Sequence, residues 1–136
     1  MIFLTKQILE NIVNDCTVCL PYEACGFLIG NRGYLKTIFD CKSVQNQSSE
    51  VNRYIINPVD FYNIESSLTN RNLSIVGFYH SHPAGSHHPS RYDIQDAWQD
   101  YSYVILANST IKSWSMKSWL IDSKSGHCQE ESISMV

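Results

Sequence analysis

The sequence lacks any apolar run long enough to cross a membrane and any cluster of Lys and Arg. Nowhere do about 18 consecutive apolar residues occur, and residues 1–6 hold no basic region followed by a long apolar stretch. The formal net charge of -3 and the pI near 5.9 give no electrostatic footprint for nucleic acid or for an anionic membrane. We therefore expect no nucleic-acid partner, no membrane partner and a cytoplasmic location.

A disulfide framework is also missing. The five cysteines are an odd number scattered through apolar segments, which indicates reduced thiols. Cys16 and Cys19 form a CxxC, but no second cysteine pair could complete a zinc site with them. With 43% hydrophobic and 17% charged residues over 136 positions, the composition is that of one globular domain, which we expect to span residues 1–136.

Helical and strand patterns of hydrophobic residues follow one another along the chain. Helical spacing covers three segments, the first behind Thr5 and the second behind Asn57: residues 6–19, 58–68 and about 90–100. Strand-like apolar runs cover residues 24–30, 34–44, 73–79, 103–107, 112–122 and about 128–135, with turns at 108–109 and 123–126. This order predicts an α/β or α+β fold.

Side chains that can bind a metal follow the strand expected at residues 73–79. Residues two apart on a strand project from one face, so His80 and His82 can present two imidazoles to one ion. After a loop rich in Gly, Ser, His and Pro, Asp93 at the start of a helix can supply a carboxylate. Two His and one carboxylate leave a tetrahedral zinc one position short, and in catalytic sites water takes that position as a nucleophile.

A base must take the proton from such a water, and Glu23 is the carboxylate in the most suitable environment. It precedes the apolar run at residues 24–30, where partial desolvation favours a raised pKa. Each feature also has a structural explanation: a lone HxH can pack at a strand end, and Ser90 with Asp93 forms a Ser-x-x-Asp capping box. The conjunction of all these residues in this order favours the metal site.

His80-Ser81-His82-Pro83, six residues, Ser90, two residues and Asp93 together resemble the JAMM (MPN-plus) signature at every position. The segment from Pro21 to Gly30 resembles the glutamate segment of that family, and Val76-Gly77-Phe78-Tyr79 resembles the strand before its histidines. The resemblance extends from the first helix to the carboxy-terminal strands. It therefore covers nearly the whole chain.

The resemblance implies a zinc metallopeptidase in which His80, His82 and Asp93 bind Zn²⁺. Glu23 would be the general base and acid, and the Ser90 hydroxyl would stabilise the tetrahedral oxyanion. The implied fold is a curved mixed β-sheet flanked by helices, similar to cytidine deaminases. Deaminase chemistry itself is disfavoured because the HxE and PCxxC patterns that it uses are missing.

The short chain resembles the compact bacterial members of the family, since it has little room for insertions that grip ubiquitin. The leading hypothesis is therefore hydrolysis after the C-terminal Gly-Gly of a ubiquitin-like sulfur-carrier protein, with release of a cysteine or another adduct. Two alternatives stay open: a deconjugating or processing peptidase of a bacterial ubiquitin-like conjugation system, and a non-catalytic MPN-type interaction module. The sequence leaves the carrier and the oligomeric state open.

Two further histidines, His87 and His88, lie in the loop between the expected ligands. Either could touch the metal or the substrate, but exposed loop histidines are the commoner case, so neither is predicted to be a ligand. The three tryptophans, at positions 98, 114 and 119, are most simply aromatic residues of the core or of the sheet surface.

Overall fold

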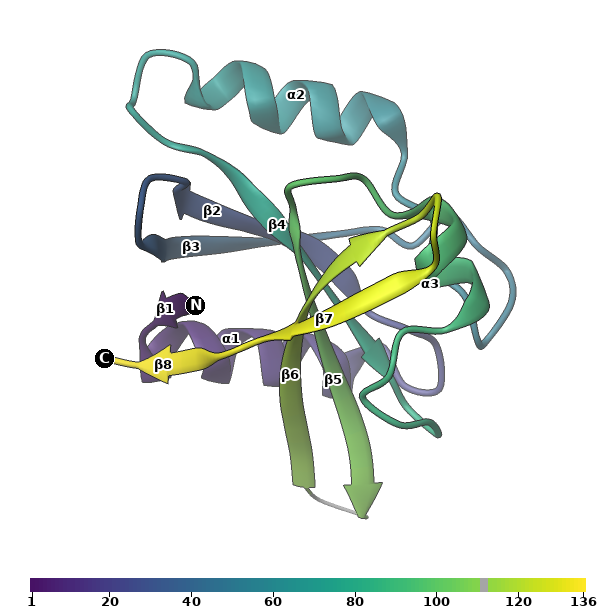
Figure 1. The fold of residues 1–136 in the computed structure, drawn as a ribbon. Helices are drawn as coiled ribbons and strands as arrows, with labels where there is room; N and C mark the ends of the chain where they lie inside the picture. The colour runs from purple at the N-terminus through teal and green to yellow at the C-terminus, as the bar shows by residue number, and fades with distance from the viewer. Residues whose placement is uncertain (111–112) are drawn as a thin grey trace.

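The computed structural model describes residues 1–110 and 113–136 and contains a mixed eight-stranded sheet with helices packed on both of its faces (Figure 1). The helices are α1 (Lys6–Val18), α2 (Pro58–Leu68) and α3 (Arg91–Asp96). The strands are β1 (Ile2–Leu4), β2 (Cys25–Asn31), β3 (Lys36–Val44), β4 (Ser74–His82), β5 (Ser102–Thr110), β6 (Ser113–Asp122), β7 (His127–Glu131) and β8 (Ile133–Met135). Of the helices in the described residues, none combines the length and apolar character that a membrane crossing needs.

The sheet curls until its two ends meet. The strand order is β7-β6-β5-β4-β2-β3-β1-β8, so β7 and β8 are the two outermost strands. Only Ser132 separates them in the chain, and the Ile2 backbone N–H donates to the Ser132 carbonyl at 2.9 Å. In Figure 1 these two strands run on as one yellow ribbon. The sheet is therefore curved and nearly barrel-shaped, which confirms the fold class expected from the sequence.

Successive residues of the central strands supply two separate cores, one on each face of the sheet. In β5, Val104 and Leu106 pack with α1, while Tyr103 and Ile105 pack with residues of α2. This alternation is the period of two that strands impose on their side chains. Because both faces are covered, β5 reads as a continuous apolar run in the sequence.

The helices begin where the sequence indicates. The Thr5 side chain accepts a hydrogen bond from Ile8 N at 3.3 Å, and the Asn57 side chain accepts one from Val59 N at 2.9 Å. Each bond satisfies an amide that the first turn of a helix leaves without an intrahelical partner. The expected helices at residues 6–19 and 58–68 are confirmed to within a residue at each end.

Other boundaries differ from those expected. The helix expected to reach about residue 100 ends at Asp96, because Ala97 is extended and Trp98 N donates to the Tyr103 hydroxyl at 2.6 Å. The turn expected at residues 108–109 lies inside β5, and the start of the next strand at residue 112 falls outside the described residues. The run expected at about 128–135 is two strands, β7 and β8.

Candidate metal centre

Both histidines of the HxH motif lie in the last three residues of β4. In this part of β4, Phe78 packs in the core on the α2 side and Tyr79 packs in the core on the α1 side. His80 and His82 lie two and four residues after Phe78, so their side chains project from the same face of the strand as that of Phe78. His80 is fully buried and His82 is 8% exposed, so both imidazoles have left bulk water.

The carboxylate of Asp93 closes a triangle with the two imidazoles. Its Oδ2 atom lies 3.0 Å from Nε2 of His80 and 3.0 Å from Nε2 of His82. The two Nε2 atoms lie 3.1 Å from one another. Three potential ligand atoms from two segments of the chain therefore face a common point.

The start of α3 orients this carboxylate. Ser90 N donates to Asp93 Oδ2 at 2.8 Å, and Asp93 N donates to Ser90 Oγ at 3.1 Å, which completes a capping box. The structural and the chemical interpretations of Ser90 and Asp93 are therefore compatible, because one oxygen atom caps the helix and faces the histidines. The Ser90 hydroxyl accepts the Asp93 amide and keeps its own hydrogen for another acceptor.

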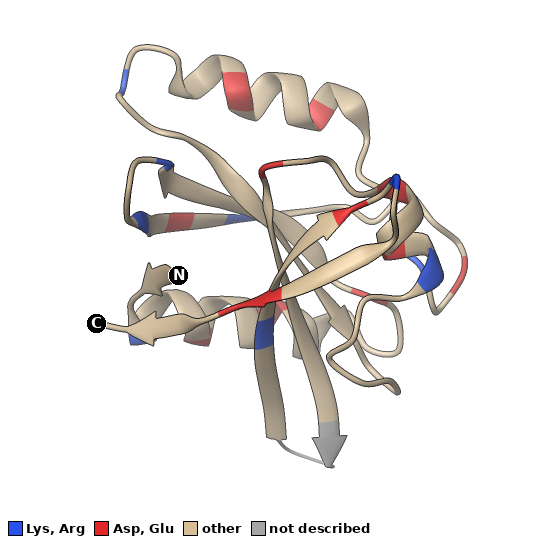
Figure 2. Ribbon diagram, in the orientation of Figure 1, with Lys and Arg blue, Asp and Glu red and all other residues tan. Residues whose placement is uncertain are grey.

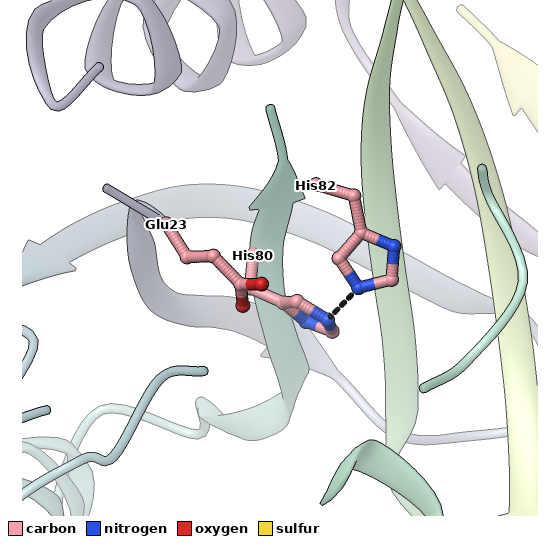
Figure 3. Close-up of side chains that lie close together, drawn as sticks. All are labelled: Glu23, His80 and His82. Carbon is pink, nitrogen blue, oxygen red and sulfur yellow. Dashed lines mark hydrogen bonds between the residues drawn. The ribbon is translucent and has the colours of Figure 1, made fainter. Parts of the chain in front are cut away.

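Strand pairing brings Glu23 to the histidines despite their distance in the sequence. β2 and β4 are antiparallel with Cys25 opposite His80, so the residues before β2 run alongside the end of β4. Ser81 N donates to the Ala24 carbonyl at 3.1 Å, and Ala24 N donates to Ser81 Oγ at 2.8 Å, which extends this pairing. One ligand atom from each of Glu23, His80 and His82 lies within 4.8 Å of the others (Figure 3).

Glu23 carries a buried carboxylate oxygen with no hydrogen-bond partner among the described residues. The side chain is 4% exposed, and its Oε1 atom is the unpartnered one. Burial raises the pKa of Glu23 to about 8, because the charged form has lost its hydration. A carboxyl group in this state can exchange a proton near neutral pH.

Asp93 and His80 have protonation states that suit a cation. Burial alone would lower the pKa of His82, but hydrogen bonds with Asp93 and the Ser86 carbonyl raise it. Burial alone would raise the pKa of Asp93, but its electrostatic interaction and hydrogen bond with His80, and its hydrogen bonds with His82 and the Ser90 amide, hold it below its ordinary range. Burial lowers the pKa of His80 and so favours its neutral form. A carboxylate and a neutral imidazole are the forms in which these side chains bind metal ions.

The donor set fits zinc. Ligand atoms about 2.0–2.2 Å from a tetrahedral zinc lie about 3.3–3.6 Å apart, and the three atoms of His80, His82 and Asp93 are 3.0–3.1 Å apart. Two His and one carboxylate are a set typical of catalytic zinc, in which the fourth position is open. A carboxylate oxygen of Glu23 lies within 4.8 Å of a ring nitrogen of each histidine, which places the group beside the open position.

The site lies at the wall of a cleft with a volume of about 840 Å³. Glu23, His82 and Ser90 line it, together with the exposed apolar side chains of Leu20 and Val51. The structure thus brings together all the predicted site residues: Glu23, His80, His82 and Asp93 converge, and Ser90 borders the same cleft. Their individual roles stay predictions.

Two aspects of the site are not evident from the sequence. Tyr54 stacks on the His80 ring with centroids 4.3 Å apart, although it comes from an irregular segment before α2 that carries no helix or strand pattern. His87 and His88 contact strand β6, where His87 bonds Ser115 and the His88 ring packs on Trp119 with centroids 4.8 Å apart. His88 also lines the cleft beside the site. Neither of these two histidines belongs to the cluster of potential ligands within the described residues.

Residues 5–122 match the family described as prokaryotic homologs of the JAB domain. A desampylase from Haloferax volcanii is 33% identical over 89 residues, which are 64% of this chain and 63% of that protein. The protein named "Probable TtuB-protein conjugate cleaving protease" from Thermus thermophilus is 28% identical over 114 residues, which are 84% of this chain and 75% of that protein. The chain therefore spans somewhat less than two thirds of the desampylase.

Solved structures share the fold along the whole chain. The solution structure of a protein from Desulfitobacterium hafniense superposes with a TM-score of 0.89 at 28% identity, covering 100% of this chain and 93% of that one. A JAB1/MPN domain protein from Archaeoglobus fulgidus superposes with a TM-score of 0.57 at 17% identity, covering 100% and 99%. The second likeness concerns the fold alone.

Proposed function

Because this chain belongs to the family of prokaryotic homologs of the JAB domain, we propose that it is a zinc-dependent peptidase or isopeptidase. Its substrate is a ubiquitin-like protein, and the hydrolysed bond follows the C-terminal Gly-Gly of that protein. The activity belongs to one domain that spans residues 1–136. The observation that carries the proposal is the convergence of His80, His82 and Asp93 beside the unpartnered carboxylate oxygen of Glu23.

The three convergent residues hold the zinc ion in this proposal. When bound, zinc acts as a Lewis acid toward the scissile carbonyl and makes water acidic enough to be a nucleophile near neutral pH. Glu23 takes the proton of the attacking water, because its carboxylate lies beside both histidines, and it passes that proton to the leaving amine. A carboxyl with a pKa near neutral can do both in turn.

Ser90 acts on the substrate carbonyl as that oxygen gains negative charge. Its Oγ atom already accepts the Asp93 amide at 3.1 Å, so the direction in which its own O–H can donate is restricted. The residue lines the cleft that Glu23 and His82 also line. A donor that is positioned before the reaction stabilises the tetrahedral oxyanion without reorganisation.

The names of both curated relatives favour cleavage of protein conjugates over release of a small adduct. One is called a desampylase and the other a TtuB-protein conjugate cleaving protease. A protein conjugate needs an open cleft, and the cleft at Glu23 is large and bordered by exposed apolar residues. We therefore extend the leading hypothesis of a sulfur-carrier substrate to modifiers conjugated to proteins.

The test compares two substrates with one enzyme preparation. A ubiquitin-like protein is joined after its Gly-Gly either to a lysine side chain of a second protein or to a single cysteine. Zinc content is measured on the same sample. One zinc per chain with cleavage of the protein conjugate supports the proposal, whereas efficient cleavage of the cysteine adduct alone would favour the carrier-processing alternative. A zinc-loaded protein that cleaves neither would point to an interaction module.

A further inference from the structure

The loop between the two parts of the metal centre is fastened to strand β6, far from the ligands in the sequence. This ligand loop comprises residues 83–89. Trp119 Nε1 donates to the His87 carbonyl at 2.8 Å, and the His87 ring forms a hydrogen bond with the Ser115 hydroxyl. The indole of Trp119 also supports the His88 ring, with centroids 4.8 Å apart. Two β6 side chains thus hold the middle of the ligand loop.

The residue just before these contacts touches a metal ligand. The Ser86 carbonyl lies 2.6 Å from Nδ1 of His82. A carbonyl only accepts, so Nδ1 of His82 must carry the hydrogen, which leaves the lone pair for a metal on Nε2. Nε2 is also the atom that faces His80 and Asp93. The position of one backbone carbonyl therefore selects the binding tautomer and fixes the plane of the ring.

The geometry points to Trp119 and Ser115 as positioning residues for the metal centre. Through His87 they fix the Ser86 carbonyl, and through that carbonyl they orient His82. The inference rests on the proposed zinc site and assigns a role to residues that touch neither metal nor substrate. Trp119 is 5% exposed, so its contacts are shielded from competing water. Groups that orient a metal ligand in this way typically change metal affinity 10–100-fold when they are removed.

β6 offers a matched control within the same strand. Trp114 also donates its indole N–H to a side chain of another element, the Thr17 hydroxyl of α1, at 3.2 Å. Trp114→Phe and Trp119→Phe therefore remove the same chemical group from the same strand. Only the second removes a bond to the ligand loop.

The experiment measures zinc affinity by competition with a chromophoric chelator, and the visible d–d spectrum of the cobalt-substituted protein. For Trp119→Phe we expect zinc affinity about tenfold weaker and an altered cobalt spectrum. For Trp114→Phe we expect wild-type values of both. Neither readout needs a substrate, and the cobalt spectrum reports ligand geometry, which a loss of packing elsewhere leaves unchanged.

Ser115→Ala removes the other anchor with little change in volume and serves as a second variant if Trp119→Phe folds poorly. Weaker zinc binding by Ser115→Ala and a cobalt spectrum shifted in the same way support the inference. Wild-type affinity and spectrum in both variants overturn it and leave the proposed function intact. Failure of the wild-type chain to bind zinc overturns the proposed function and this inference together.

Discussion

Replacing Glu23 with Gln keeps the shape of the side chain and removes the carboxylate that, in the proposal, accepts the proton of the attacking water. Gln has the same shape, and the side chain is only 4% exposed, so the packing around it is retained. It cannot accept a proton and return it. Positioned general acid–base groups contribute about 10²–10⁴-fold, which corresponds to about 2.7–5.4 kcal/mol of barrier. We expect the kcat of Glu23→Gln to fall by this factor.

Zinc binding should survive the same change. The three atoms that lie 3.0–3.1 Å apart belong to His80, His82 and Asp93, which are the zinc ligands in the proposal, whereas Glu23 takes the proton of the water. Single-turnover cleavage of a conjugate, with the zinc content of each sample, separates loss of chemistry from loss of metal. Glu10→Gln, at an exposed glutamate of α1, is the control. Glu23→Gln with one zinc and a kcat within tenfold of wild type would refute the assignment.

Three other changes test separate parts of the structure. Ser90→Ala should lower kcat about 10²–10³-fold and destabilise the fold by about 1 kcal/mol, since it removes the proposed oxyanion donor and a helix cap; kinetics and urea unfolding measure the two losses. Gly77→Ala should lower the free energy of unfolding, measured in urea, by at least about 1–3 kcal/mol, because the alanine Cβ would lie 1.9 Å from the Ser102 carbonyl oxygen. An unchanged unfolding midpoint would contradict the close approach of β4 and β5. Burial alone would raise the pKa of Glu131, but hydrogen bonds, first of all that from Lys36, lower it. The ionised Glu131 therefore stabilises the fold above about pH 4.3, and this stabilisation is lost as the pH falls further. Thermal unfolding of Glu131→Gln, measured from pH 3 to pH 7, should lack this part of the acid destabilisation.

The sequence predicts the components of the site better than their arrangement. His80 and His82 are correctly expected on one face at a strand end, because the period of two is a local property of a strand. The spacing of Ser90 and Asp93 likewise predicts the capping box that the structure contains. The proximity of Glu23 is different, because it depends on the pairing of β2 with β4 and no local pattern specifies a partner strand.

The least predictable elements are the ones that close the sheet. β1 and β8 have three residues each, which is too short for any periodicity to be recognised. The place of Tyr54 is unpredictable for a related reason, since the stacking of a ring in an irregular segment follows no local sequence pattern. The end of α3 depends on a hydrogen bond from Trp98 to Tyr103, a tertiary contact that overrides the helical pattern beyond Asp96.

One oxygen atom of Asp93 couples the folding of α3 to the binding of an ion at the candidate metal centre. Oδ2 accepts the Ser90 amide that begins this six-residue helix, and it also faces both imidazoles. A helix this short has little stability of its own. An ion that holds the carboxylate in place must therefore protect the α3 amides from hydrogen exchange, and by linkage whatever unwinds α3 must weaken the hold on the ion.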